Sequence, residues 1–174
     1  YYCDFHFTVS LKQKVRVMNA IHKEISLRSD ECSAETMDTI YIGGGTPSLL
    51  DIRKVVKLFV TIYHHFRISS KPEITFEANP DDLQEDYLKE LKNNTPVNRL
   101  SIGIQSFTDR DLSFLNRRHN ALEGIQSVCR SKKNGFGNLN VDLIYGIPGM
   151  SQQEWQHTLD TFHSLDVPHL SAYH

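Results

Sequence analysis

The chain has 174 residues, of which 39% are hydrophobic and 23% are charged, and its formal net charge is −2. This is the composition of an ordinary globular domain, long enough for one sizeable core. Without a basic excess, nucleic acid and anionic membrane surfaces are poor candidates for partners, and no apolar run approaches the roughly 20 residues that span a bilayer.

Predicted helices and strands alternate along the chain. Apolar residues at helical spacing predict a helix at about 11–28, and the strand TIYI at 39–42 follows it. The later elements continue the alternation, with helices at about 49–66, 83–91, 109–130 (with a break expected near Asn120) and 155–162, and strands at 73–77, 99–105, 140–147 and 169–173. Because a helix joins each strand to the next, the strands should be parallel.

This alternation predicts an α/β fold class, a parallel β-sheet with alternating helices. No linker, low-complexity segment or close repeat interrupts the pattern, so we expect one domain over residues 1–174. The pattern by itself fits an open doubly wound sheet or part of a barrel. About five βα units are too few to close an eight-stranded barrel.

Polar residues and glycines gather where the predicted strands end. They are Gly43 to Thr46 after the first strand, then Glu77 and Asn79, Gln105, Tyr145 and Gly146, and Tyr173 and His174. The carboxyl ends of parallel strands lie on one face, which carries the ligand site in both barrels and open sheets. Any buried strand must become polar where it surfaces, but that requirement leaves three consecutive glycines unexplained. The strand ends therefore form the candidate site.

The segment IGGGTPS is the most specific local signal. Its glycines let the backbone approach a ligand, while Thr46 or Ser48 can cap the next helix with Pro47 in the first turn. A helix N-terminus attracts an anion such as a carboxylate or a phosphate. However, the G-K-[ST] ending of a P-loop is absent, and Ser48 stands where G-x-G-x-x-G needs its last glycine. A tight strand–helix turn without a ligand is the structural alternative.

Asp142 lies in the middle of a predicted strand between apolar neighbours. An ionised carboxylate is costly there unless it is paired. Arg117 or Arg118, in the segment LNRRHN, is a candidate partner. The alternatives are a buried structural ion pair and a ligand contact, and Glu77 has a similar ambiguity between ligand contact and helix cap.

The three cysteines, Cys3, Cys32 and Cys129, are odd in number and widely spaced. They form no disulfide framework and favour a reducing compartment, so we expect a cytoplasmic protein. Cys32 lies in a polar loop, and Cys129 is expected to be a buried thiol on an amphipathic helix.

Seven motifs occur in one order along the whole chain from Tyr1 to His174: YCDF, YIGGGTPS, ITFEANP, LSIGIQSF, LNRRHN, VDLIYGIPG and LSAYH. Together they resemble the radical S-adenosylmethionine (radical SAM) proteins of the oxygen-independent coproporphyrinogen III oxidase group. Within that group the resemblance is closest to the haem-chaperone branch. It implies a partial (β/α)6 barrel whose first strand precedes residue 1, in agreement with the five predicted strands.

The resemblance also implies a 4Fe–4S cluster held by three cysteines spaced C-x-x-x-C-x-x-C, with one iron left open to S-adenosyl-L-methionine. Thiolates are the soft, charged ligands that such clusters take. Cys3 matches the third cysteine, and the first two would lie upstream of residue 1. Family members carry a further C-terminal region, so we expect a chain truncated at both ends that by itself lacks a stable cluster and a catalytic state.

Five residues match the part of the family site that binds S-adenosylmethionine beside the cluster. Tyr2 matches an aromatic residue that lies beside the adenine. Gly44, Gly45 and Thr46 match the loop that receives the methionine end of the cofactor. Glu77 matches a carboxylate that contacts the same molecule.

Three residues on later motifs match the part of the site that differs between the branches. Gln105, Arg117 and Asp142 match residues that contact a second S-adenosylmethionine in the oxidase branch. The oxidase branch also carries a further cysteine two positions after the third cluster ligand, where this chain has Phe5. Phe5 therefore favours the haem-chaperone branch.

Two functions in haem and porphyrin metabolism follow from the resemblance. A haem chaperone binds haem, which the resemblance implies for the full-length protein, and passes it to cytochromes. An oxygen-independent coproporphyrinogen III oxidase instead uses a 5′-deoxyadenosyl radical to decarboxylate its porphyrinogen substrate to protoporphyrinogen IX. A generic hydrolase or phosphate-binding barrel is a third alternative, but it needs a nucleophile–base pair or a phosphate loop, and neither is found in the sequence.

Overall fold

A computed structural model describes residues 11–174, so the predicted contacts of Tyr2, Cys3 and Phe5 lie outside the described residues. The described chain forms one parallel sheet whose strands follow the order of the sequence. The strands are β1 (Thr36–Ile42), β2 (Arg67–Ala78), β3 (Arg99–Gln105), β4 (Asn138–Ile144) and β5 (His169–Tyr173). The prediction of a parallel α/β sheet with alternating helices is confirmed.

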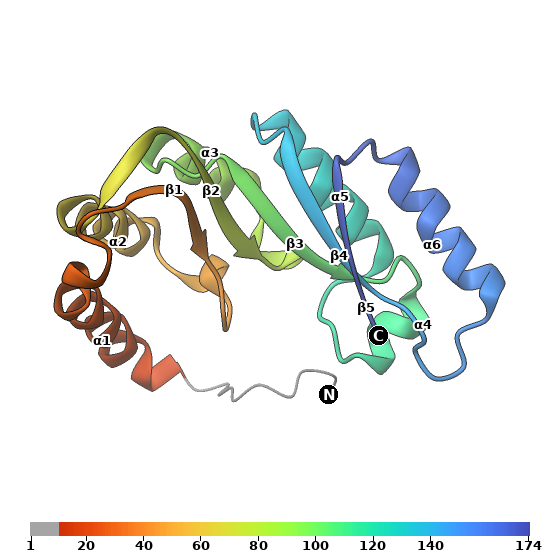
Figure 1. Cartoon of the computed structure of the whole chain (residues 1–174). Coiled ribbons are helices and arrows are strands. Elements are labelled where there is room, and N and C mark those ends of the chain that lie inside the picture. The colour runs from red at the N-terminus through yellow and green to blue at the C-terminus, as the bar shows by residue number, and fades with distance from the viewer. Residues whose placement is uncertain (1–10) are drawn as a thin grey trace.

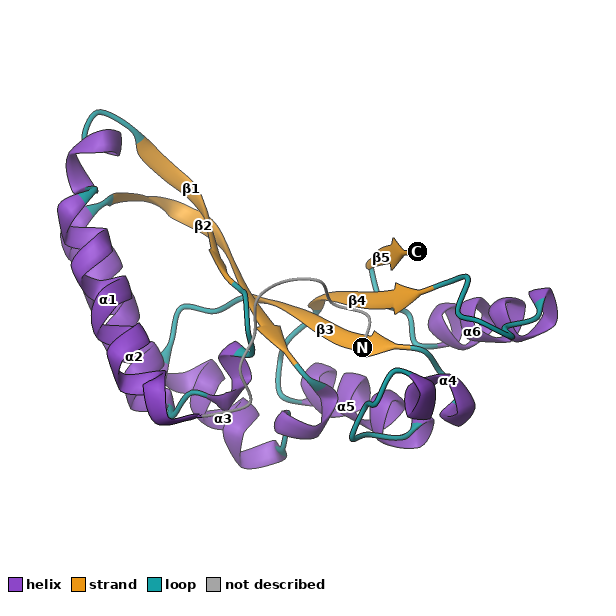
Figure 2. Cartoon of the chain, turned by 90° about the horizontal axis from the view of Figure 1, so that it is seen from below, coloured by secondary structure: helices purple, strands orange, loops and turns teal. Residues whose placement is uncertain are grey.

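Helices connect the strands and lie on the outer face of a curled sheet (Figures 1 and 2). They are α1 (Lys14–Leu27), α2 (Ile52–His65), α3 (Glu85–Asn94), α4 (Asp109–Phe114), α5 (Ala121–Lys133) and α6 (Gln152–Ser164), with short 3-10 turns η1 (Leu11–Gln13), η2 (Ser29–Cys32), η3 (Pro47–Leu49) and η4 (Pro80–Asp82). A doubly wound sheet would reverse its strand order and carry helices on both faces. The sequential order and one-sided helices therefore define part of a barrel, which settles the alternative that the sequence left open.

The hydrophobic core lies between the outer face of the sheet and the helices. Alternate residues of the central strands point into it, and the fully buried ones are Ile74 and Phe76 of β2, Leu100, Ile102 and Ile104 of β3, and Leu139, Val141 and Leu143 of β4. Because successive side chains of a strand point to opposite faces, the residues between these apolar ones line the inner, concave face. Those residues are polar except for Gly103, so the concave face is the polar side of the sheet.

Most element boundaries agree with the prediction, and β2 differs most. It begins at Arg67 rather than near 73, because Arg67 and Ile68 already pair with the start of β1 before a shift in register. The expected break near Asn120 is confirmed, since α4 ends at Phe114 and Asn120 caps α5 in a capping box with Glu123. The break leaves 115–120 as a connecting segment at the carboxyl end of the sheet.

The cap predicted for α2 is wrong. Thr46 makes no side-chain capping bond, and Ser48 lies inside the short turn η3. Asp51 caps α2 instead, with its carboxylate accepting the backbone N–H of Arg53 at 2.9 Å. The turn η3 separates the glycine-rich loop from α2, so the side chain of Ser48 serves another contact.

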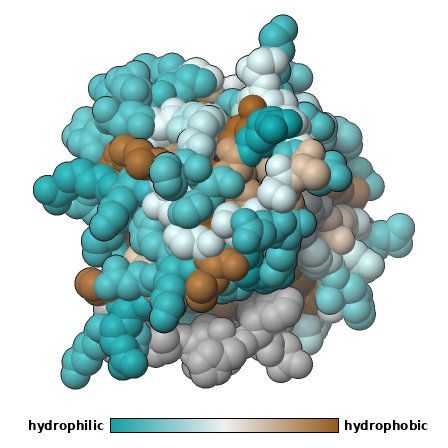
Figure 3. Space-filling view, turned by 60° about the vertical axis from the view of Figure 1, so that its left-hand side comes forward, coloured by the Kyte–Doolittle hydropathy of each residue, from teal (hydrophilic) through white to brown (hydrophobic). Residues whose placement is uncertain are grey.

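The outer helices present a largely hydrophilic surface. Figure 3 shows the side that carries α1 and α2, where small hydrophobic areas are scattered over a hydrophilic surface. The exposed large hydrophobic residues of these helices include Val15, Val60 and Tyr63. Scattered apolar residues of this kind are normal on a protein surface. Among the residues that the structure describes, no helix is long and apolar enough to cross a membrane.

Candidate functional site

Glu77, at the end of β2, holds the glycine loop (Gly43 to Gly45) that follows β1. Its Oε2 accepts the backbone N–H of Gly44 at 2.9 Å, and its Oε1 accepts the hydroxyl of Tyr41 at 2.8 Å. Burial, together with the hydrogen bond to Glu77, raises the pKa of Tyr41 to about 12, so the phenol stays protonated and donates. The two bonds fix the position of the loop over the concave face.

Glycine is required at the three positions of the loop for different structural reasons. Gly44 and Gly45 have φ angles of +79° and +60°, a conformation that is strained for other residues. A Cβ on Gly43 would lie 2.6 Å from the ring of Tyr41 and 2.8 Å from the carboxyl carbon of Glu77. Apart from the neighbouring residues in the chain, no described atom lies within 4 Å of the Cβ positions of Gly44 and Gly45, so this side of the loop is open.

Asp142, on β4, is held by neutral groups. Its Oδ1 accepts the amide of Asn140 at 2.7 Å, and its Oδ2 accepts the hydroxyl of Ser101 at 3.2 Å. Burial raises the pKa of Asp142 above its ordinary value. The expected arginine partner is not among the described contacts: Arg117 and Arg118 donate to other groups. Asp142 is therefore a partly buried carboxylate without a described cation partner.

Gln105 and Arg117 meet at Gly103 of β3. Arg117 Nη2 donates to the carbonyl of Gly103 at 2.8 Å and to Asn79 Oδ1 at 2.7 Å. A Cβ on Gly103 would lie 2.8 Å from Gln105 Nε2 and 3.7 Å from Arg117 Nη2. Gly103 pairs across the ladder with Asp142, so the structure brings all three predicted residues, Gln105, Arg117 and Asp142, to one place.

Gln105 has an unusual backbone for a buried residue that is not glycine. Its φ angle is +71°, and the register between β3 and β4 shifts between Gly103 and Gln105. Bulges and strained backbone positions are frequent beside functional sites, where they redirect a side chain. The strain supports the choice of Gln105 as a site residue.

The two clusters of residues form one continuous strip across the concave face. Glu77 lies opposite Ser101 in the β2–β3 register, and Ser101 in turn donates to Asp142. The strip therefore runs from the glycine loop across β2 and β3 to β4. It offers backbone groups, two carboxylates, an amide and a guanidinium. This set suits a polar ligand that carries both a positive and a negative charge.

Several residues that build this strip were missed by the sequence reasoning. Tyr41, Ser101 and Asn140 position the two carboxylates, and Ser171 of β5 bonds to Asn140 at 3.0 Å. A signal for them was present, because polar residues at every second position of a buried strand indicate a polar inner face. Reading β3 and β4 with period two would have selected Ser101 and Asn140.

The described residues contain no group of three His, Cys, Asp or Glu side chains that could hold a metal ion. Cys32 lies in η2 and Cys129 on α5, both as free thiols. Cys129 is exposed, so the expectation of a buried thiol is wrong. The predicted cluster ligand, Cys3, lies outside the described residues 11–174.

Replacing Asp142 with Asn is expected to increase stability at pH 7. A carboxyl with a raised pKa in the folded state contributes stability below its unfolded pKa of about 3.9 and loses that contribution as the pH rises through the folded pKa. The amide does not ionise, so the gain in melting temperature of Asp142→Asn should grow from pH 4 to pH 7. Thermal unfolding over that range measures the gain.

The matched control for this prediction is Asp166→Asn, because the side chain of Asp166 is 100% exposed. Its melting temperature should stay close to that of the parent protein at every pH. A difference for Asp142→Asn that does not change with pH would contradict the assignment of the raised pKa to this carboxyl.

A partial parallel β/α barrel with a glycine loop and a strip of polar residues at its strand ends belongs to the class of barrel proteins whose ligand sites lie at the carboxyl end of the strands. The model of the Radical SAM superfamily matches residues 1–162, and the chain belongs to that family. Membership implies a 4Fe–4S cluster and S-adenosylmethionine as the cofactors of the family.

Curated relatives of this chain within the radical SAM family include heme chaperones. The chain is 35% identical over 173 residues to the heme chaperone HemW of Lactococcus lactis subsp. lactis (strain IL1403) and 37% identical over 175 residues to that of Bacillus subtilis (strain 168). Each match covers 99% of this chain but only 45% and 46% of the relatives. The chain thus spans less than half the length of these proteins.

A solved structure with a similar fold is coproporphyrinogen III oxidase (HemN) from Escherichia coli, a radical SAM enzyme. The superposition has a TM-score of 0.87 with 25% sequence identity, and it covers 99% of this chain and 40% of the enzyme. The partial-barrel fold and the expected relation to this group of proteins are confirmed.

Proposed function

We propose that this chain is the S-adenosylmethionine-binding core of a radical SAM haem chaperone. The observation that carries the proposal is the glycine loop, held by Glu77 at one end of a polar strip on the concave face. The choice of a chaperone is supported by the identity of 35% and 37% to two proteins named heme chaperone over nearly the whole chain.

The residues around the loop fit the methionine end of the cofactor. The backbone of Gly44 and Gly45 can contact the ammonium and carboxylate groups of the cofactor. The side chain of Thr46 makes no capping bond, so its hydroxyl can contact the cofactor as well. A carboxylate offers about four lone-pair sites, so Glu77 can accept a further donor beyond Tyr41 and Gly44. We assign the methionine end to this group.

The N-terminal motif would complete this part of the site. We propose Cys3 as a cluster ligand, together with two cysteines of the full-length protein, and Tyr2 as the residue beside the adenine. When bound, the cluster supplies the electron for reducing S-adenosylmethionine. Two free cysteines, Cys32 and Cys129, agree with a reducing compartment such as the cytoplasm.

Gln105, Arg117 and Asp142 are proposed as further contacts for S-adenosylmethionine. Arg117 supplies a positive charge, Asp142 a negative charge and Gln105 an amide, and all three gather at Gly103. Because Asp142 is held by neutral donors, a cationic ligand group near it would relieve the burial of its charge. The strip is therefore suited to a zwitterionic cofactor rather than to a neutral one.

The second candidate function is oxygen-independent coproporphyrinogen III oxidase. It is favoured by the TM-score of 0.87 to the Escherichia coli enzyme. Phe5 argues against it, because that position holds a cysteine in the oxidase branch. For the chaperone, the proposed partners are haem and the cytochromes that accept it; for the oxidase, the partner is a porphyrinogen.

The full-length protein distinguishes the two functions. We expect it, under anaerobic conditions with S-adenosylmethionine and a reductant, to bind haem tightly and to leave coproporphyrinogen III unchanged. Absorption spectra during haem titration and chromatography of the porphyrins measure these outcomes. The Escherichia coli oxidase is the positive control for this assay. Conversion of coproporphyrinogen III to protoporphyrinogen IX would contradict the chaperone function and support the oxidase function.

A further inference from the structure

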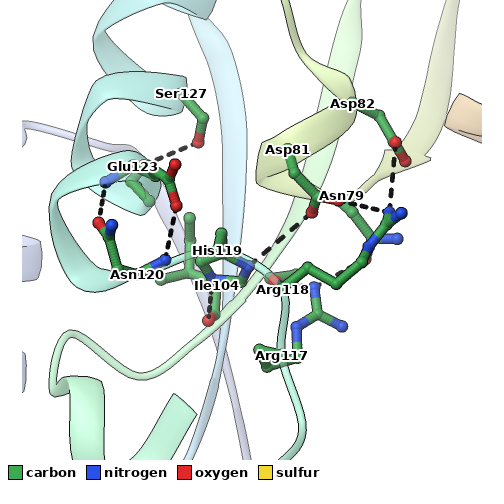
Figure 4. Close-up of polar contacts among 12 residues, drawn as sticks. Asn79, Asp81, Asp82, Ile104, Arg117, Arg118, His119, Asn120, Glu123 and Ser127 are labelled. Atoms are coloured by element: carbon green, nitrogen blue, oxygen red, sulfur yellow. Dashed lines mark hydrogen bonds and ion pairs between the residues drawn. The ribbon is translucent and has the colours of Figure 1, made fainter. Parts of the chain in front are cut away.

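The segment 115–120, between α4 and α5, packs against the residues that follow β2 (Figure 4). The guanidinium of Arg118 pairs with the carboxylate of Asp81 and lies 3.5 Å from Asp82 Oδ1. The two aspartates are largely buried, with side chains 24% and 12% exposed. Because two adjacent carboxylates repel each other, the positive charge of Arg118 between them offsets that repulsion.

Asp82 connects this ion pair to the glycine loop. Its Oδ2 accepts the hydroxyl of Ser48 at 2.6 Å, and the same hydroxyl oxygen accepts the backbone N–H of Asn79 at 3.2 Å. Ser48 is buried and lies two residues after Thr46. The turn η3, which follows the glycine loop, is thus attached through Asp82 to the turn η4 after β2, while Glu77 holds Gly44 within the loop.

His119 connects the same segment to β3. Its Nε2 lies 3.1 Å from the carbonyl oxygen of Ile104, the residue before Gln105. Its Nδ1 lies 3.9 Å from Asp81 Oδ1. Burial lowers the pKa of His119, and the neighbouring Arg117 acts in the same direction, so the ring stays neutral and donates from Nε2. The segment therefore holds the strand ends on both sides of Arg117.

We propose that Arg118 is a positioning residue that sets the glycine loop through Asp82 and Ser48. It lies outside the polar strip, and its side chain is 67% exposed, so its effect on a ligand would pass through these contacts. The proposal rests on the proposed function, in which Gly44 to Thr46 bind S-adenosylmethionine. Loss of an orienting contact of this kind typically weakens binding by about tenfold or more.

The first test measures S-adenosylmethionine affinity of the full-length protein by calorimetry. Arg118→Gln should bind about tenfold more weakly, and Arg118→Lys, which keeps the charge, should recover most of the affinity. The matched control is Arg28→Gln, because Arg28 also pairs with two carboxylates, Glu24 and Glu31, and its side chain is 59% exposed. Arg28 follows the last residue of α1 and is not part of the polar strip or of the segment 115–120, so the control should bind like the parent protein.

A double-mutant cycle distinguishes positioning through Ser48 from general destabilisation. If Arg118 acts through Asp82 and Ser48, Ser48→Ala combined with Arg118→Gln should bind little more weakly than Ser48→Ala alone. Losses in affinity that add fully, or normal binding by Arg118→Gln, would overturn the proposal.

Amide hydrogen exchange of the cofactor-free protein separates this proposal from the proposed function. Arg118→Gln should increase exchange at Gly44 to Ser48 and leave the amides of α1 unchanged, whether or not the protein binds S-adenosylmethionine. If the parent protein binds no cofactor but the loop still exchanges faster in the variant, the proposed function fails and the positioning role stands. Unchanged exchange in the loop overturns the positioning role.

Discussion

Glu77→Gln is expected to weaken the binding of S-adenosylmethionine to the full-length protein by about 100-fold, or about 3 kcal/mol. The carboxylate accepts two hydrogen bonds, from Gly44 N–H and from Tyr41, and both donors face it at short distance. An amide presents only one oxygen, so one donor loses its acceptor, and the negative charge that faces the cofactor is removed. Isothermal titration calorimetry measures the loss.

Glu73→Gln is the matched control for Glu77→Gln. Glu73 lies on the same strand, and its side chain is half exposed and 3.9 Å from Arg99. Because the pair is long and Glu73 is half exposed, it contributes little, and the control should keep both its affinity and its melting temperature. Normal binding by Glu77→Gln would remove Glu77 from the proposed cofactor site.

Gly43→Ala is expected to reduce the affinity for S-adenosylmethionine by roughly 10–100-fold while changing the melting temperature little. The new Cβ would lie 2.6 Å from the Tyr41 ring and 2.8 Å from the Glu77 carboxyl, so both side chains must move. Both contacted groups are the ends of flexible side chains, which can shift without unfolding the protein. The displaced carboxylate then no longer holds Gly44 in place.

Gly137→Ala is the matched control for Gly43→Ala, because it adds the same methyl group at another glycine. No described atom lies within 4 Å of its Cβ position, so the added methyl group meets open space. We expect its affinity and its circular-dichroism melting curve to match those of the parent protein. If Gly43→Ala lowers the melting temperature and the affinity together, the loss reflects the fold rather than the displacement of Glu77.

The elements that could be predicted from sequence are those with strong local signals. The strand β3 is predicted at 99–105, as observed, because Leu100, Ile102 and Ile104 alternate with polar or small residues. The start of β2 could not be placed, because Arg67 and Ile68 become a strand only by pairing with β1. Caps were also ambiguous, since Thr46, Ser48 and Asp51 are all suitable cap residues and only the chain path selects Asp51.

The sequence alone determined the fold class and which strand ends carry the candidate site. Parallel strands joined by helices must expose their carboxyl ends together, so Gly44, Glu77 and Gln105 could be assigned to one face before their distances were known. Asp142 lies in the middle of its predicted strand, and only the family resemblance assigned it to the site. These conclusions depend on periodicity and on chain direction, which are local properties of the sequence.

Only the tertiary structure decided which side chains hold these residues in place. Arg118 is suited to pair with any carboxylate, including Asp142, but the path of the segment 115–120 places it against Asp81 and Asp82 and leaves Asp142 to Ser101 and Asn140. The physical reason is that hydrogen bonds and ion pairs act over about 3–4 Å. Partners far apart in the chain are therefore selected by the curvature and register of the sheet.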